Sequence, residues 1–125
     1  MTESEVQQLI LMEAPRYQCH LMRNNSGAFK DSTGRWVRYG LMNHSKKQNE
    51  KIKSSDLIGF KGIDCGSRFY AVFVAIECKE SGFKFNPEDP RQAAQKAFIE
   101  FVKSNGGIAG FCDSIESFQK LMSSI

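Results

Sequence analysis

The chain opens with apolar residues at helical spacing. Val6, Leu9 and Ile10 recur at the three- and four-residue intervals of one helix face. Ser4 offers a capping hydroxyl before them, and Pro15 ends the pattern because proline has no N–H to continue a helix. We therefore predict a first helix that stops at Pro15.

Three short segments after this helix have the composition of strands. Residues 17–23 alternate loosely between apolar and polar side chains, and residues 35–39 are aromatic and β-branched. Residues 24–27, Asn-Asn-Ser-Gly, are typical of a turn. Residues 56–60 form a third short strand, and we expect a glycine-containing turn over 61–67.

The most apolar run of the chain lies in its second half. The first eight of residues 69–79 are almost continuously apolar, which predicts a strand covered on both faces. A helix follows over about residues 91–104 and ends at Gly106-Gly107. Residues 108–112 form a last short strand, and residues 113–116 have the spacing of a capping box for a final helix.

The predicted element order is α-β-β-β-β-α-β-α. A helix between the strongest strand and the last strand indicates a parallel crossover connection. This pattern predicts an α/β fold with a mixed central sheet flanked by helices on both faces. The 125 residues form one domain, because a chain of this length supports a single core.

Composition excludes several classes of protein. No apolar run reaches the roughly 18 residues of a membrane span. An acidic, polar start does not resemble a secretory signal, so we expect an intracellular protein without membrane contact. The four cysteines form no C-x-x-C pair and only two histidines accompany them, which makes disulfide and zinc sites weak interpretations.

Charge is concentrated in the first half of the chain. Residues 16–61 contain ten Lys and Arg against three acidic residues, a net +7, whereas the whole chain carries +3. Residues 43–54 are polar and rich in lysine, and we predict a mobile basic loop there. A basic segment fits a polyanionic partner or simply a solvated lysine surface, and charge alone does not separate the two.

Two charged residues end the strongest strand. Glu77 and Lys79 are two positions apart, so their side chains share one face of the strand. Burying two charged side chains at the end of a core strand is costly unless water, a partner or a metal ion interacts with them. Alternatively, the two side chains form an ordinary ion pair where the strand reaches solvent. Asp56 opens the preceding strand, although the Ser54-Ser55-Asp56 segment is also good capping material.

Asp56 and Glu77 together offer oxygen ligands of the kind that Mg²⁺ and Mn²⁺ prefer. The backbone carbonyl of Cys78 is a further candidate ligand. A metal there would bind the scissile phosphate and lower the pKa of a water nucleophile. Lys79 would orient that water or neutralise charge that develops on the phosphate.

Two further residues are candidates for the same site. Glu5 on the first helix extends the metal shell if that helix crosses the sheet, and Glu3 and Glu13 compete for the role. Gln95 is a polar residue among apolar helix positions, and it is either a site residue or part of the exposed helix side.

Seven segments in order resemble the VRR-NUC family, the virus-type replication-repair branch of the PD-(D/E)xK nucleases. They span about residues 3 to 118, nearly the whole chain. The segments are Glu5-Val6-Gln7, Arg23-Asn24-Asn25-Ser26-Gly27-Ala28, Val37-Arg38-Tyr39-Gly40-Leu41, Ser55-Asp56-Leu57-Ile58-Gly59, Ala75-Ile76-Glu77-Cys78-Lys79, Gln95-Lys96-Ala97-Phe98-Ile99 and Gly106-Gly107-Ile108-Ala109-Gly110.

This resemblance implies a restriction-endonuclease-like core and Mg²⁺- or Mn²⁺-dependent hydrolysis of DNA phosphodiesters. It assigns metal binding to Glu5, Asp56 and Glu77, and catalytic roles to Lys79 and Gln95. Short stand-alone members, many from phages, resemble Holliday-junction resolvases and act as homodimers, whereas longer members cut flaps and crosslinks. The resemblance places Arg23, Asn24, Asn25 and Ser26 near DNA. Further candidates for DNA binding are the basic residues Arg35, Arg38, Lys46, Lys47, Lys51 and Lys53.

Two features depart from the family pattern. The segment 43–54 is longer and more basic than the usual short link, which leaves the docking of DNA there open. Cys78 replaces the more usual valine between the acid and the lysine, with little expected consequence because only its backbone would be used.

The favoured hypothesis is a homodimeric, structure-selective DNA endonuclease of viral replication or repair, in the cytoplasm of a bacterial host if phage-encoded. The alternatives are a less selective nickase or flap nuclease, and a non-catalytic module that binds branched DNA. A cysteine-based redox or metal sensor is a third possibility that the cysteine spacing does not favour.

Overall fold

A computed structural model of the chain describes residues 1–124. A short 3-10 helix (Ala14–Tyr17) extends the first α-helix. The observed order is α-β-β-β-α-β-β-α-β-α. The elements are α1 (Glu3–Glu13), β1 (Cys19–Arg23), β2 (Gly27–Lys30), β3 (Trp36–Tyr39), α2 (Lys46–Lys51), β4 (Leu57–Asp64), β5 (Phe69–Cys78), α3 (Pro90–Ser104), β6 (Ile108–Cys112) and α4 (Ile115–Ser123).

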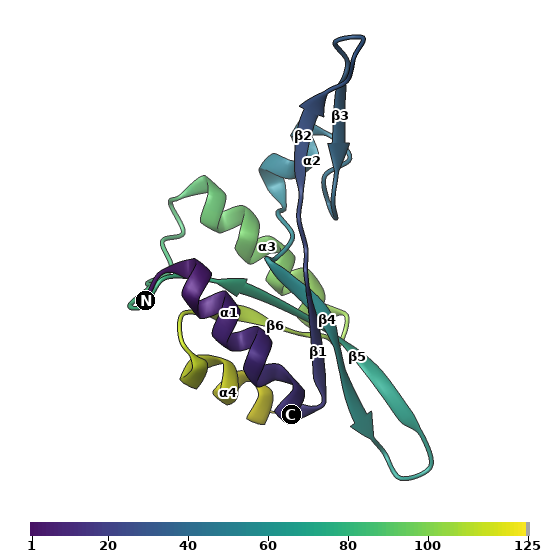
Figure 1. The fold of residues 1–125 in the computed structure, drawn as a ribbon, viewed down its shortest axis with the longest axis vertical. Coiled ribbons are helices and arrows are strands. Elements are labelled where there is room, and N and C mark those ends of the chain that lie inside the picture. The colour runs from purple at the N-terminus through teal and green to yellow at the C-terminus, as the bar shows by residue number, and fades with distance from the viewer. Residues whose placement is uncertain (125) are drawn as a thin grey trace.

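Four strands form the central sheet in the order β1-β4-β5-β6 (Figure 1). The β1–β4 and β4–β5 pairs are antiparallel, whereas β5 and β6 run parallel. Parallel neighbours need a crossover connection, and α3 provides it. The prediction of a mixed sheet with helices is confirmed, including the crossover between the strongest strand and the last one.

The helices cover the two faces of the sheet in different numbers. Side chains alternate along β5, so Val74 and Ile76 pack in one core with α1 and α4. Ala75 points to the other face, where it packs with Phe98 and Ile99 of α3. The C-terminal half of β5 is therefore buried on both sides, and the residue after Ile76 lies on the α3 side.

The first half of β5 does not follow the prediction. Residues 69–73 are largely exposed, with Phe69 at 65% and Tyr70 at 49%. Here β5 pairs with β4, which continues to Asp64 and leaves only residues 65–68 for the turn. The hairpin extends beyond the helices, so its aromatic side chains have no layer to pack against (Figure 1). The apolar run correctly predicted a strand, but the prediction that both faces of this strand are buried is wrong for residues 69–73.

The predicted mobile basic loop is also wrong in part, because α2 lies within residues 43–54. The Ser45 hydroxyl caps this helix by accepting a hydrogen bond from the Gln48 N–H at 3.1 Å. The Lys53 N–H donates to the carbonyl of Ala94 at 3.0 Å, which fixes the end of the segment to α3. A short helix with nothing to bury leaves no apolar period in the sequence.

The predicted turn at residues 24–27 is instead a link into a separate hairpin. Gly27 begins β2, which pairs antiparallel with β3, and these strands form a two-stranded sheet of their own. We call residues 27–39 the arm, because the hairpin projects away from the central sheet (Figure 1). Among the described residues, no helix is long and apolar enough to cross a membrane.

The predicted helix caps are displaced by one or two residues. Thr2, not Ser4, caps α1 and forms a capping box with Glu5. At α4 the capping box joins Ser114 and Ser117 rather than beginning at Asp113. In both cases a hydroxyl near the predicted one satisfies the first N–H groups of the helix.

Candidate active site

The strand register brings Asp56 and Glu77 together. Leu57 pairs with Ile76, so Asp56, one residue before β4, lies opposite Glu77. The Oδ2 of Asp56 accepts a hydrogen bond from the Cys78 N–H at 3.0 Å. Glu77 is only 4% exposed and lies on the α3 side of the sheet. Two carboxyl groups therefore meet where β5 leaves the core, as the sequence predicted.

The pKa of Glu77 is raised from 4.5 to about 10, mainly by burial. A side-chain hydrogen bond with Asp56 and the negative charge of Asp56 contribute to the increase, whereas the charge of Lys79 opposes it. Two neighbouring buried carboxyl groups resist ionising together without a cation, because their charges repel. Glu77 thus holds a proton at neutral pH when no cation is bound.

A cavity of about 680 Å³ opens beside this carboxyl pair. Asp56 and Glu77 form one part of its lining, and the link between β1 and the arm forms another. Asn24 is held in place there, because its side-chain amide donates to the Ser54 hydroxyl and to the Ser55 carbonyl, both at 2.9 Å. The lining is mostly polar, which fits a charged ligand better than an apolar one.

Three cationic side chains also line the cavity, and they come from separate elements. Arg38 from β3 donates to the Asn43 side chain at 3.0 Å, and Arg91 lies in the first turn of α3. Lys53 follows α2. Burial lowers the pKa of Lys53, and the positive charges of Arg91 and Arg38 contribute to the decrease. Mutual repulsion of this kind is relieved when an anion enters the cavity.

Gln95 is the most informative neutral residue of the site. It lies on α3, is 4% exposed and lines the cavity. Its Oε1 is buried and has no hydrogen-bond partner within residues 1–124. A buried carbonyl oxygen without a partner is costly, and it is available to a ligand or a cation.

No protein-family model, curated protein or solved structure matches this chain.

The structure brings about half of the predicted site residues to the cavity. Those that line it are Asp56, Glu77, Gln95, Asn24, Asn25, Ser26, Arg38 and Lys53. Those that do not line it are Glu5, Cys78, Lys79, Arg23, Arg35, Lys46, Lys47 and Lys51. The lining also contains Arg91, Asn43 and Asn49, which sequence reasoning missed. Arg91 was accessible from the sequence, because it precedes Gln95 by four residues on a helix and so shares its face.

Glu5 serves its own helix rather than the cavity. Its carboxylate accepts a hydrogen bond from the Thr2 hydroxyl at 3.1 Å within the capping box. Glu3 is the residue of α1 that approaches the site, because its charge acts on Glu77. Its Oε1 also lies 3.9 Å from the Lys79 ammonium.

Lys79 lies beside the site without lining the cavity. It is 8% exposed, and its ammonium lies 5.3 Å from the ring centre of Phe83 and 5.9 Å from that of Phe111. These contacts and the Glu3 ion pair give Lys79 structural partners of its own. Its charge still reaches Glu77, whose pKa it lowers.

A divalent cation fits the donors present, although they are few. Within the described part of the chain, no three His, Cys, Asp or Glu side chains cluster as a metal site. Asp56, Glu77 and the partnerless Oε1 of Gln95 are all oxygen donors, however, and they line the same cavity. Mg²⁺ and Mn²⁺ accept one or two carboxylates together with water and substrate oxygens, so a partial protein shell is sufficient.

Proposed function

We propose that this chain is a Mg²⁺- or Mn²⁺-dependent endodeoxyribonuclease of the VRR-NUC type, with a restriction-endonuclease-like core, that hydrolyses DNA phosphodiester bonds. One observation carries the proposal. The Asp56–Glu77 carboxyl pair lines a cavity that also holds Arg38, Lys53 and Arg91. A phosphodiester needs both features, cations for its charge and carboxylates for a metal.

The metal would be held by Asp56, Glu77 and the backbone carbonyl of Cys78. The Cys78 N–H points to Asp56, and the N–H and C=O of one strand residue point to the same side of the strand. When bound, the ion would supply Lewis-acid chemistry, which neutralises phosphate charge and activates water near neutral pH.

The chain's own residues have separate tasks in this reaction. Arg38, Lys53 and Arg91 bind and orient the phosphate. The Gln95 amide holds the attacking water or a phosphate oxygen in line. Glu77 gives up the proton on its carboxyl when a positive charge arrives, so that both carboxylates are ionised during the reaction.

Lys79 acts on the same centre from outside the cavity. Its charge favours the ionised form of Glu77. We assign it this electrostatic role because it does not line the cavity.

We extend the proposal to branched DNA and to a homodimer, because symmetric cuts at a junction need two sites related by a two-fold axis. A nickase, a flap nuclease and a non-catalytic module that binds branched DNA are the other outcomes of the test.

The test compares cleavage of a four-way junction, a flap and a linear duplex with Mg²⁺, with Mn²⁺ and with EDTA. We expect metal-dependent cleavage by the wild type and a loss of at least about 100-fold in Glu77→Ala and Asp56→Asn. Metal-independent cleavage, or equal cleavage by both variants, contradicts the mechanism. Binding without cleavage under every metal supports the non-catalytic module, and light scattering measures whether the chain is dimeric.

A further inference from the structure

The arm has an exposed surface whose outer residues, Lys30 and Trp36, do not line the cavity beside the carboxyl pair. Its strand pairs place Lys30 beside Trp36 and Ala28 beside Arg38, so these four side chains share one face of the hairpin. Trp36 is 66% exposed, and the Lys30 ammonium lies 5.3 Å from its ring centre. The central sheet does not pair with β2 or β3.

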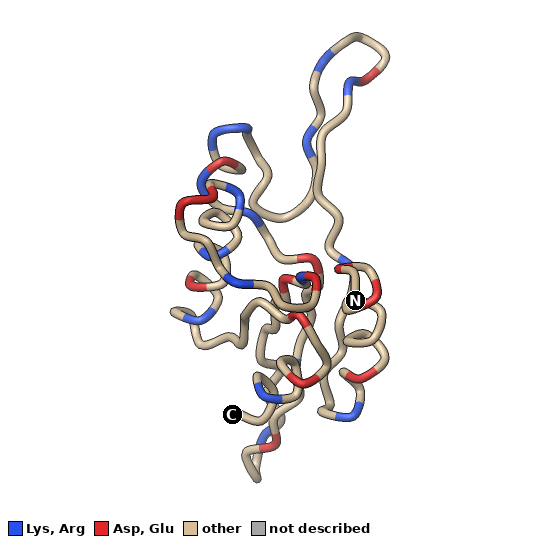
Figure 2. The backbone as a smooth tube through the Cα atoms, turned by 90° about the vertical axis from the view of Figure 1, so that its left-hand side faces the viewer, with Lys and Arg blue, Asp and Glu red and all other residues tan. Residues whose placement is uncertain are grey.

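The charge of the arm is positive and available. The arm contains three basic residues, Lys30, Arg35 and Arg38, and one acidic residue, Asp31. The Asp31 carboxylate is occupied by its own turn, where it accepts hydrogen bonds from the Thr33 hydroxyl and the Arg35 N–H. Figure 2 shows basic positions recurring along the hairpin, with acidic colour confined to the region of its tip.

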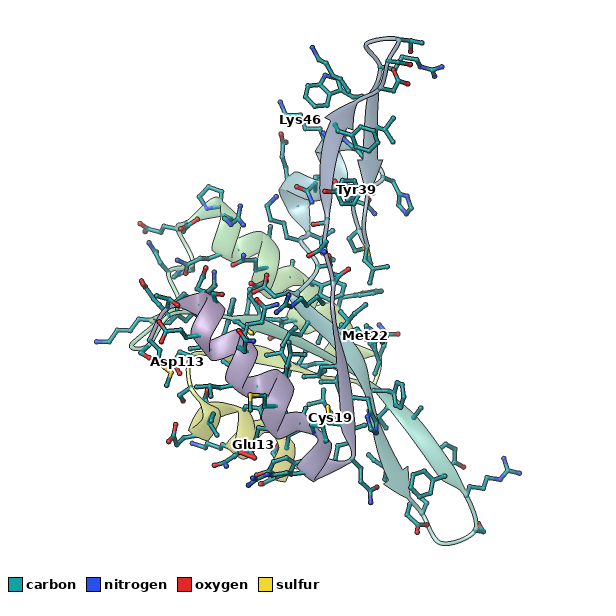
Figure 3. All side chains as sticks on the ribbon, viewed as in Figure 1. Glu13, Cys19, Met22, Tyr39, Lys46 and Asp113 are labelled. Carbon is teal, nitrogen blue, oxygen red and sulfur yellow. The ribbon has the colours of Figure 1, made fainter. Side chains whose placement is uncertain are left out.

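The base of this face is continuous with the cavity. Ala28 and Arg38 belong to the face and also line the cavity beside the carboxyl pair. The Lys30–Trp36 pair lies two positions farther along the hairpin, away from the cavity. Side chains of the arm, Tyr39 among them, stand on a ribbon that rises clear of the central sheet (Figure 3). A nucleic-acid strand with one phosphate in the cavity would therefore run onto this face.

We infer that the arm face formed by Ala28, Lys30, Trp36 and Arg38 binds single-stranded DNA next to the cleavage site, with an unpaired base stacked on Trp36. Lys30 and Arg38 pair with the phosphates on either side of that base. Exposed aromatics alternating with cations are the chemistry that binds single strands, because every base has a π-face and every linkage a charge. The inference rests on the proposed function, since it names the DNA that the cavity would cut.

The chain contains one tryptophan, so its fluorescence reports on this face alone. The full chain in EDTA is titrated with oligothymidylate, with a blunt duplex and with the same duplex carrying a single-stranded tail. We expect quenching by the oligothymidylate and the tailed duplex and little quenching by the blunt duplex. The Glu77→Gln variant in Mg²⁺ should give the same pattern.

Affinity is measured by anisotropy of labelled DNA. Loss of one stacking contact in Trp36→Ala should weaken binding of the tailed duplex by about five- to 150-fold. The effect on the blunt duplex should be much smaller, and Trp36→Phe should restore most of the affinity. The matched control is Phe69→Ala, which removes an equally exposed aromatic from the other hairpin and should change neither affinity nor quenching.

Three results overturn the inference. They are no quenching by single strands, equal losses for tailed and blunt DNA in Trp36→Ala, and conversion of a dimer to a monomer by Trp36→Ala, which assigns the face to a second copy of the chain. Quenching without any cleavage under any metal leaves the inference standing and defeats the proposed function. Cleavage without quenching supports the proposed function and overturns the inference about the arm.

Discussion

At the scale of one residue, Glu77 shows the energetic cost of the proposed site. Its side chain is 4% exposed, next to Asp56, in a position that an apolar residue would fill at lower cost. The chain accepts a protonated carboxyl group there when no cation is present. Carboxyl groups with strongly raised pKa values cluster at functional sites, where a bound ligand offsets the cost of their burial.

The pH dependence of stability tests this residue. The pKa of Glu77 is raised in the folded chain, so in EDTA the unfolded chain releases this proton first as pH rises above about 4.5. The folded state loses relative stability from there until the pH reaches the folded pKa of about 10. Glu77→Gln, which does not titrate, should gain stability over wild type between about pH 5 and pH 8 in urea denaturation. A difference that is constant with pH contradicts the assignment.

At the scale of elements, α3 does two things at once. One of its faces covers the sheet through Phe98 and Ile99, and its first turns present Arg91 and Gln95 to the cavity. The N-terminal turn of α3 is fixed by Asp89, whose side chain accepts hydrogen bonds from the next N–H groups. A single helix thus connects the stability of the core to the geometry of the site.

Two glutamines on this helix should respond to the same substitution in opposite ways. Gln95→Leu removes a buried oxygen without a partner, so the free energy of unfolding should rise by about 1 kcal/mol while cleavage falls at least about tenfold. Gln92→Leu removes a hydrogen bond of 2.7 Å to the Asn86 N–H, so stability should fall by about 1 kcal/mol with cleavage unchanged. Urea denaturation and a cleavage assay measure both. Unchanged cleavage in Gln95→Leu removes Gln95 from the reaction.

The elements also show how far sequence patterns reach. The parallel crossover was predictable, because a long amphipathic helix between two strands allows few other connections. The α2 helix was not, because residues 46–51 bury nothing and leave no apolar period. The β2 strand was not predictable either. It has only four residues, and its one apolar pair across the hairpin, Phe29 with Val37, is not evident from the sequence alone.

The residues of the site were also predictable only in part. Asp56 and Glu77 were predictable as a pair, because adjacent antiparallel strands fix what lies opposite. The structure places Glu5 in the capping box of α1 and not in the cavity lining, because the helix begins two residues earlier than a cap at Ser4 predicts. Lys79 lies two positions after Glu77 and so shares its face of the strand. That spacing does not determine how the long lysine side chain bends toward Glu3 and Phe83.

Charge is organised at the scale of the whole molecule. Arg38 of the arm, Lys53 after α2 and Arg91 in the first turn of α3 line one cavity, although they are far apart in the sequence. Blue positions recur along the arm as well (Figure 2). A chain with a net charge of only +3 thus gathers several cationic side chains at and beside one cavity. Long-range attraction of DNA depends on such local concentration more than on net charge.

Salt dependence measures this contribution. Arg91→Ala should weaken binding of a blunt duplex in EDTA and reduce the slope of log affinity against log salt by about 0.9, the value for one lost phosphate contact. Lys103→Ala is the control, because it removes a charge from the opposite end of α3 that already pairs with Glu100 at 3.7 Å. Equal slopes for the two variants contradict a phosphate contact at Arg91.

The arm's isolation from the central sheet has a consequence for how such a protein diversifies. Its turn and outer strand residues are absent from both hydrophobic clusters and from the carboxyl pair. Insertions, deletions or exchanges at residues 30–36 should therefore leave both hydrophobic clusters and the carboxyl pair unchanged. Under the proposed function, lineages can acquire new DNA preferences by rebuilding this hairpin, while the hydrolytic centre is inherited intact.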